Sequence, residues 1–244
     1  MRPEADGRRI ERTLLIDADD TLWENNVYYL RCLARFQDYM EALGCDREVA
    51  RATLECVERE TIPTMGYGPE GYVAALGIAC ERLLSDGRGS DEPIPRDVIE
   101  GARAVGALVL NIPIVLIPGV EATLAALRPS SELLLVTKGN TEVQRRKLER
   151  SGLEPYFDAV YVVPEKDAEV YRRIAADRGL HPKHTWMVGN SPRSDINPAI
   201  EAGLGAILVP HDHTWTAEIQ VIDRPDLVVT LERFADLVPF FGVE

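Results

Sequence analysis

The sequence predicts an α/β fold in which a parallel sheet carries helices on both faces and a mostly α-helical segment follows the first strand. Three observations support this prediction. Short apolar runs alternate with segments of helical periodicity in the second half of the chain. Several of these runs end in polar residues, which is typical of strands that reach a ligand-binding edge. Residues 24–111 interrupt the alternation, with helical patterns and no convincing strand.

The first predicted strand covers residues 13–18, where the apolar run TLLIDA ends in a cluster of acids. The further predicted strands are residues 132–137, 159–163, 185–189, 205–209 and 226–229. Helical spacing separates them, over residues 119–127, 140–151, 167–178 and 194–203. Strands that alternate with helices build β-α-β units, and the sheets of such units bind ligands beyond the carboxyl ends of their strands.

The inserted segment is predicted to form several helices. The first has one apolar face, formed by Val27, Leu30, Leu33, Ala34, Met40 and Leu43. Further helices are predicted over residues 48–60, 71–84 and 96–110. The breakers between them are Gly44, the Pro- and Gly-rich residues 63–69, and the polar run 85–95. Within that run, residues 85–92 are expected to form a mobile loop.

Composition limits the partners that the protein can have. The chain has 244 residues, 45% of them hydrophobic, which is ample for a sizeable core. Its formal net charge of -13, from 27 basic and 40 acidic residues, argues against a nucleic-acid or anionic-membrane partner. No apolar run approaches the ~20 residues that span a bilayer, and the start has no pattern of a signal peptide. We therefore expect a soluble, cytoplasmic protein.

The cysteines show no pattern of a metal site. They are Cys32, Cys45, Cys56 and Cys80, without a C-x-x-C pair and without a histidine nearby in sequence. In a cytosolic protein we expect buried free thiols, rather than a zinc site, a disulfide or a catalytic thiol.

Acids cluster at the end of the first predicted strand, in the run Asp17-Ala18-Asp19-Asp20-Thr21. Packed carboxylates repel one another unless donors or a cation offset their charge, and a divalent metal would do so. Strand alternation directs Asp17 and Asp19 to the same side, which suits a nucleophile and a general acid/base acting on one substrate. The alternative for this motif alone is a solvated acidic turn that closes the strand.

Two further strand ends carry candidate anion ligands. Thr137 and Lys138 precede a helix, where a hydroxyl and free backbone N–H groups can bind an anion. A threonine that caps the helix is the alternative. Lys166 follows a strand and precedes a helix, and a surface lysine is the alternative there. The chain has four lysines against 23 arginines, and two of the four occupy these strand ends, which favours a functional role.

A fourth strand end carries Asn190 and Asp195. Both side chains offer oxygen atoms of the kind that Mg²⁺ binds. The alternative for Asp195 is a capping role near the start of the helix predicted over residues 194–203.

The order and spacing of these motifs resemble the haloacid dehalogenase superfamily, over about residues 13–210. That family has four motifs: D-x-D-x-T, a Ser or Thr, a Lys, and an acidic loop. All four map onto this sequence. The resemblance implies a Rossmann-like core formed by residues 1–23 and 112–244, with a helical cap formed by residues 24–111.

The resemblance also implies a role for each motif. Asp17 would attack phosphorus and form an aspartyl-phosphate, while Asp19 would protonate the leaving group and then deprotonate the attacking water. The implied phosphate-binding residues are Thr137, Lys138 and Lys166. The implied ligands of Mg²⁺ are Asp17, Asp19 through its backbone carbonyl, Asn190 and Asp195.

The chain departs from the family pattern in two places. Asn190 replaces the Asp that usually follows Gly189, so the metal site has one charge fewer. Lys166 is followed by Asp167 instead of the common Pro, a change from which we infer little. The loss of charge at Asn190 supports an alternative to catalysis, a weak or inactive phosphate-binding or regulatory module of the same fold.

Within the family, the residues favour a phosphatase acting on a small phosphorylated metabolite. Dehalogenases lack the second acid of D-x-D, which here is Asp19. Phosphonate hydrolysis in the family uses a cap lysine, but residues 1–137 contain no lysine. Sugar-phosphate mutases use a histidine in the cap or hinge, but all four histidines lie at residue 181 or later.

Three more residues carry separate expectations. Tyr67 lies between two helices of the predicted cap, where the family places substrate-specificity residues, and we expect it to contact the substrate. His211 and His213 are two apart, and a second metal site is conceivable there. A polar loop after a strand is the favoured interpretation of this pair.

Overall fold

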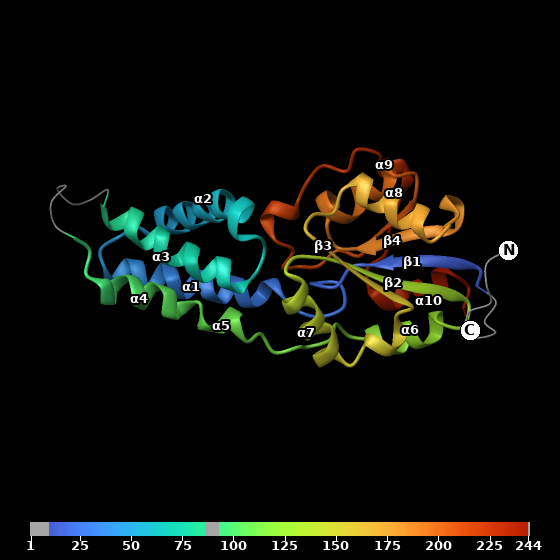
Figure 1. Cartoon of the computed structure of the whole chain (residues 1–244), viewed down its shortest axis with the longest axis horizontal. Helices are drawn as coiled ribbons and strands as arrows, with labels where there is room; N and C mark the ends of the chain where they lie inside the picture. Colours follow the sequence, from blue (N-terminus) through green and yellow to red (C-terminus); the bar gives the residue numbers. More distant parts are fainter. Residues whose placement is uncertain (1–9, 86–92, 244) are drawn as a thin grey trace. The chain divides into compact units, whose positions relative to one another are not determined.

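The computed structural model describes residues 10–85 and 93–243 (Figure 1). The chain divides into two compact units. Met1–Asn26 and Ile114–Glu244 form the first, here called the core unit, and Val27–Pro113 form the second, here called the helical unit. Of residues 85–92, expected to form a mobile loop, Ser85 is the last residue of helix α3 (Pro69–Ser85), and residues 86–92 lie outside the described residues.

The described part of the core unit contains a six-stranded parallel sheet in the order β3-β2-β1-β4-β5-β6. The strands are β1 (Arg12–Ile16), β2 (Ser131–Lys138), β3 (Ala159–Val163), β4 (Thr185–Gly189), β5 (Gly205–Leu208) and β6 (Val228–Thr230). The chain runs outward from β1 to β3 and then returns to the other side of β1 with β4. Such a reversal of strand order creates a ligand-binding crevice at the carboxyl ends of the strands. The predicted α/β fold is confirmed.

Helices cover both faces of this sheet, as predicted. They are α6 (Val120–Leu127), α7 (Thr141–Ser151), α8 (Ala168–Asp177), α9 (Asn197–Glu201) and α10 (Leu237–Phe240). Leu14 and Ile16 of β1 belong to an apolar cluster with residues of α6, α7 and α10. Leu15, which points the other way, belongs to a second cluster with residues of α8 and α9. Figure 1 shows α6 and α10 on one side of the sheet and α8 and α9 on the other.

The segment predicted as one helix over residues 194–203 contains two elements. A π-helical turn covers Pro192–Ile196, and α9 follows it. The Ser191 hydroxyl accepts a hydrogen bond from the Ser194 N–H at 2.8 Å, and the Asn197 N–H bonds to the carbonyl of Pro192 five residues back. This wider turn is the reason that regular helical spacing does not describe the segment.

The helical unit has an apolar core of its own. Its described helices are α1 (Asn26–Ala42), α2 (Arg47–Met65), α3 (Pro69–Ser85), α4 (Arg96–Val105) and α5 (Ala107–Leu110), with the first residue of α1 in the core unit. All four cysteines are free; Cys32 and Cys80 are buried, as predicted, whereas Cys45 and Cys56 are half-buried. Across the described parts of both units, every helix is too short or too polar to cross a bilayer.

The buried face of α1 matches the predicted one in part, since Met40 is buried and Val27 and Leu33 are half-buried against the same cluster. The buried residues, spaced by four, are Tyr28, Cys32, Phe36 and Met40. Leu30, Ala34 and Leu43, which the sequence assigned to the apolar face, are exposed. The prediction followed the aliphatic residues, but the aromatic rings bury more apolar area and therefore decide which face turns inward.

Glycines, and not Pro63, set two boundaries in the helical unit. Helix α2 continues through Pro63 and ends at Gly66, whose φ of 72° is one that glycine adopts most readily. The single helix predicted over residues 96–110 divides at Gly106. A Cβ atom there would lie 2.5 Å from Cγ2 of Val73, so only glycine allows α3 and this segment to pack so closely.

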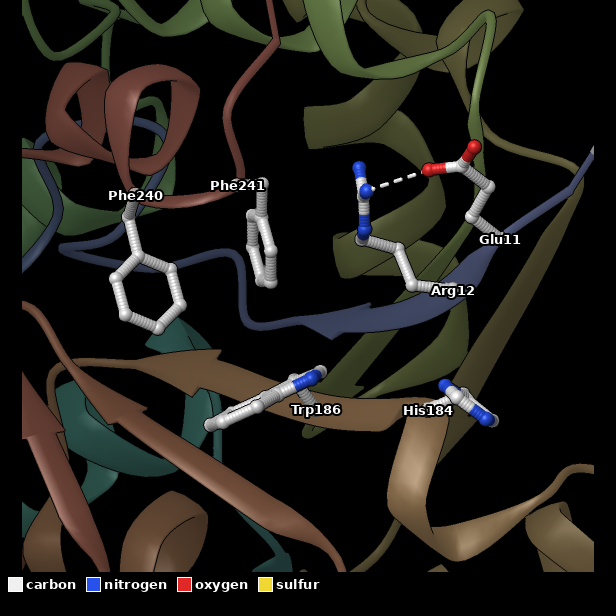
Figure 2. A pocket seen from close by; sticks show the side chains of 6 residues that line it. All are labelled: Glu11, Arg12, His184, Trp186, Phe240 and Phe241. Carbon is white, nitrogen blue, oxygen red and sulfur yellow. Dashed lines mark hydrogen bonds and ion pairs between the residues drawn. The ribbon is translucent and has the colours of Figure 1, made fainter.

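A hollow of about 420 Å³ lies where the core strands begin (Figure 2). Its lining residues are Glu11, Arg12, His184, Trp186, Phe240 and Phe241. Figure 2 shows the Arg12 side chain beside the Phe241 ring, whose centroid lies 4.9 Å from the guanidinium carbon. Since Arg12 opens β1 and His184 precedes β4, this hollow is at the opposite end of the strands from the predicted site.

Candidate active site

The polar strand ends meet at one edge of the core sheet. In the register, Ile16 pairs with Leu135 of β2 and with Val188 of β4. Asp17 therefore lies level with the last residues of both neighbouring strands, and its N–H donates to the carbonyl of Val188 at 2.9 Å. The sheet brings together the ends of β1, β2, β3 and β4, which carry the predicted catalytic, phosphate-binding and metal-binding residues.

Lys166 lies between two carboxylates at this edge. Its Nζ donates to Oδ1 of Asp17 and, at 2.8 Å, to Oδ1 of Asp195, and all three residues are buried. Burial alone would lower the pKa of Lys166, but the two carboxylates outweigh it and hold that pKa well above its usual value. Burial raises the pKa of Asp195 to about 7. The charge of Lys166 opposes this rise, and the charge of Asp17 adds to it. One ammonium thus faces two buried carboxylates, an imbalance that a further cation would offset.

Asp19 is held by three donors, two of them on α7 and one, Trp23, just after β1. Its Oδ1 accepts from Nε1 of Trp23 at 2.7 Å, Nζ of Lys147 lies 2.9 Å from both carboxylate oxygens, and Nε2 of Gln144 donates to Oδ2 at 3.0 Å. Burial opposes ionisation, but Lys147 and then Gln144 and Trp23 outweigh it and lower the pKa of Asp19. Metal binding by the backbone carbonyl of Asp19 stays a prediction.

Asp20 has a structural role in the acidic run. Its φ is 61°, and its carboxylate accepts the N–H groups of Asn25 at 2.8 Å and Asn26 at 3.0 Å, at the start of α1. Burial raises the pKa of Asp20 to about 7, against the effect of these N–H donors and with help from Asp19 and Asp17. The neighbouring Thr21 donates its hydroxyl to Oδ2 of Asp17 at 3.0 Å.

The two residues at the end of β2 have separate surroundings. The buried Oγ1 of Thr137 accepts from Nε2 of Gln144 at 2.8 Å. Nζ of Lys138 donates to Oε1 of Glu218 at 2.6 Å and to Oγ of Ser194 at 3.1 Å. Strand alternation explains the split, since consecutive side chains point to opposite faces. Phosphate binding by Thr137 and Lys138 stays a prediction.

The loop after β4 places Asn190 and Asp195. Oδ2 of Asp195 accepts the N–H of Ser191 at 3.0 Å, and Nδ2 of Asn190 donates to Oγ1 of Thr214 at 3.0 Å. A Cβ atom on Gly189 would lie 2.2 Å from Oδ2 of Asp195. The glycine that ends β4 is therefore required for Asp195 to turn back toward the strand.

A hard cation fits the oxygen atoms at this edge. The candidate donors are the carboxylates of Asp17 and Asp195, the amide oxygen of Asn190 and the backbone carbonyl of Asp19. Carboxylate and carbonyl oxygens are the ligands that Mg²⁺ prefers. The carboxylates of Asp17 and Asp195 also attract a divalent ion, since the ammonium that contacts both of them, that of Lys166, carries one positive charge.

The remaining predicted residues lie elsewhere. Tyr67 is half-buried in the turn between α2 and α3 of the helical unit, and its role in substrate recognition stays a prediction. His211 lies between two acids, with Nδ1 3.8 Å from Oδ1 of Asp20 and Nε2 3.4 Å from Oε2 of Glu24. Although these three groups come close enough to hold a metal ion, each nitrogen faces a different carboxylate. A single ring nitrogen lies within 4.8 Å of an oxygen from each acid, so the arrangement fits a bound ion as well as a polar bridge.

Sequence reasoning missed several residues of the site. Gln144 and Lys147 are three apart on α7 and therefore share a helix face, and Lys147 is one of only four lysines. Those two signals together could have found the pair. Glu218 and Thr214 lie in a loop without periodicity, and no pattern in the sequence indicates that they reach the ends of β2 and β4.

The protein has an α/β fold with a candidate active site at the carboxyl edge of its parallel sheet. Residues 11–203 match the family model described as haloacid dehalogenase-like hydrolase. The protein therefore belongs to the haloacid dehalogenase-like hydrolases, and the resemblance inferred from the motifs is confirmed. A haloacid dehalogenase-like hydrolase from Xanthomonas campestris shares the fold with a TM-score of 0.79 and 28% identity, over 98% of this chain and 93% of that one.

Two of the chain's relatives are named as phosphatases. The phosphoserine phosphatase of Thermus thermophilus is 32% identical over 250 residues, covering 87% of this chain and 96% of its own length. The N-acylneuraminate-9-phosphatase of Rattus norvegicus is 35% identical over 92 residues. That match spans 36% of this chain and 37% of the rat protein, so the likeness to it is local.

Proposed function

We propose that the protein is a Mg²⁺-dependent phosphatase that hydrolyses a small phosphorylated metabolite through an aspartyl-phosphate on Asp17. The observation that carries the proposal is the environment of Asp17. This buried carboxylate follows the central strand β1, contacts Lys166 and accepts from Thr21, with Asp19 two residues further on. The phosphatase names of the relatives in the same family support the same activity.

The reaction has two steps. In the first, a carboxylate oxygen of Asp17 bonds to phosphorus, the bond from phosphorus to the leaving oxygen breaks, and Asp19 gives that oxygen its proton. In the second, a water oxygen bonds to phosphorus, the bond to Asp17 breaks, and the carboxylate of Asp19 takes a proton from the water. The products are an alcohol and inorganic phosphate. The first step needs protonated Asp19, and the second needs the carboxylate that Lys147 stabilises.

The other polar groups would offset the charge of the phosphoryl group. Lys166, with Thr137 and Lys138 as further candidates, would bind its oxygens. Asp17, the backbone carbonyl of Asp19, Asn190 and Asp195 would hold Mg²⁺, which supplies positive charge beside the phosphoryl group when bound.

A generic aryl phosphate with Mg²⁺ tests this proposal. We expect Asp17→Asn to lower turnover by at least about 10³-fold, because it removes the nucleophile, and Asp19→Ala to do the same by removing the acid and base. Asp226→Asn, a change at an exposed aspartate, serves as the matched control. Full activity of either site variant, or full turnover in excess chelator, would contradict the assigned mechanism.

One observation favours a second candidate, a phosphate-binding module with little or no catalysis. Asn190 gives the metal site one charge fewer than the family pattern. Turnover by the wild type no higher than that of Asp17→Asn would support this candidate. Where turnover is present, a panel of phosphorylated metabolites should identify the substrate, beginning with phosphoserine, which the name of the Thermus thermophilus relative indicates.

A further inference from the structure

The orientation of the Asn190 amide is fixed by a hydroxyl in the loop after β5. Nδ2 of Asn190 lies 3.0 Å from Oγ1 of Thr214. The same hydroxyl donates to the carbonyl of His211 at 2.9 Å. A threonine hydroxyl has a single proton, and here the carbonyl takes it. The Thr214 hydroxyl can therefore only accept a hydrogen bond from Asn190, and the Asn190 amide must turn its NH₂ group toward Thr214.

The amide oxygen then faces the opposite way, toward the acids of the site. Oδ1 of Asn190 lies 3.4 Å from Oγ1 of Thr21, whose single proton goes to Oδ2 of Asp17 at 3.0 Å. Thr21 therefore does not hold the amide oxygen, and the shorter contact with Thr214 decides the orientation. Asn190 is buried, so solvent does not compete for this oxygen. The oxygen is thus presented on the side where Asp17 lies.

We propose that Thr214 is a positioning residue that makes Asn190 usable as a metal ligand. This inference rests on the proposed function, because it assumes that a divalent cation binds beside Asp17. An amide has one oxygen and one nitrogen, so a flipped Asn190 would aim two N–H donors at the cation. A carboxylate has two equivalent oxygens and needs no such control. The need for Thr214 therefore follows from the asparagine at position 190.

Cation binding measured apart from catalysis tests the proposal. Mn²⁺ binding followed by electron paramagnetic resonance and Mg²⁺ binding followed by calorimetry both report affinity without turnover. We expect Thr214→Val to weaken binding by about tenfold, within the range found when partners of metal ligands are lost. Thr214→Ser keeps the hydroxyl and should bind as the wild type does. Thr216→Val makes the same change at an exposed threonine of the same segment and is the matched control.

A double variant separates orientation of the amide from a general effect on the loop. The Asn190→Asp variant should bind the cation at least as tightly as the wild type does. Adding Thr214→Val to that variant should change its cation affinity by less than about twofold, because the two oxygens of a carboxylate are equivalent. The role of Thr214 would be overturned if Thr214→Val bound the cation as tightly as the wild type does. It would also be overturned if Thr214→Val caused the same loss of affinity with and without Asn190→Asp. Either result would leave the phosphatase proposal standing. A wild type that binds neither cation would overturn the proposed metal site and this inference with it.

Discussion

Lys166 shows how a single buried charge can decide both stability and chemistry. Its ammonium lies between Asp17 and Asp195, and all three side chains are nearly inaccessible to water. Buried ions are costly unless paired, and removing one partner leaves the others uncompensated. The same ammonium is the group that would meet the phosphoryl oxygens. Structural and catalytic demands therefore coincide at this residue.

Lys166→Met should consequently destabilise the protein by about 3 kcal/mol, because two like charges remain buried without their counter-ion. Urea denaturation measures this change, and Lys183→Met, at an exposed lysine, is the control that should have little effect. Added Mg²⁺ should recover part of the lost stability by supplying positive charge. If Lys166→Met were as stable as the wild type, the burial of Asp17 and Asp195 would not require the positive charge of Lys166.

Lys147 holds the proposed acid and base in place. Its Nζ contacts both oxygens of Asp19 and, at 2.8 Å, Oδ1 of Asn25. We expect Lys147→Met to lower kcat by about tenfold with little change in KM, since Asp19 acts in both steps but does not hold the phosphate. Lys147→Arg, which keeps a cation, should retain most of the activity. Arg146→Met, an exposed residue on the same helix, is the control, and a rise in KM at constant kcat would contradict this role.

At the scale of elements, the loop between β4 and α9 carries the strictest backbone requirement of the site. Gly189 ends β4, and Asp195 folds back over it through the π-helical turn. A Cβ atom at position 189 would also lie 2.9 Å from Cβ of Asp195, an atom that cannot move without the loop. The position of Asp195, a proposed metal ligand, thus depends on the absence of a side chain at position 189.

Gly189→Ala should cost about 2 kcal/mol of stability, as overpacking does, and should also displace Asp195. Turnover per folded molecule and Mg²⁺ affinity should therefore both fall, as enzyme assays and calorimetry can determine. Gly152→Ala gives the contrast: its φ of 71° disfavours alanine, but nothing lies within 4 Å of the added atom. That variant should lose about 1 kcal/mol and keep its activity. If Gly189→Ala also lost only about 1 kcal/mol and kept its activity, crowding against Asp195 would have no effect on the site.

The sequence predicted elements well where one physical signal dominates. Strands β3 and β4 are short runs rich in apolar residues, and their predicted bounds match the structure. The inward face of α1 follows its aromatic residues, and the π-helical turn follows local hydrogen bonds to Ser191 and Pro192, so neither is described by the periodicity of aliphatic residues. The same distinction applies to the site. Asp17 and Asp195 follow strands and were found, whereas Glu218 reaches the site from a loop whose path only the fold determines.

At the scale of the whole molecule, the chain carries a separate spectroscopic reporter for each unit. The three tryptophans, Trp23, Trp186 and Trp215, all lie in the core unit, and all four cysteines lie in the helical unit. Cys32 and Cys80 are fully buried in the apolar cluster of the helical unit and become reactive only when it opens. Tryptophan fluorescence therefore follows the core unit, and the reactivity of these two thiols follows the helical unit.

These reporters allow a prediction about where Mg²⁺ acts. Every proposed metal ligand belongs to the core unit, and a cation that binds only the folded state stabilises it by about 2.7 kcal/mol at a concentration 100 times its Kd. On thermal unfolding, Mg²⁺ should raise the midpoint seen by tryptophan fluorescence. Where the units unfold independently, the midpoint seen by labelling of the buried thiols should stay unchanged. Asp195→Asn should abolish the fluorescence shift and Asp226→Asn should preserve it. A shift that survives Asp195→Asn would locate the cation away from the end of β4 and would leave Asp17 without the metal that its proposed chemistry requires.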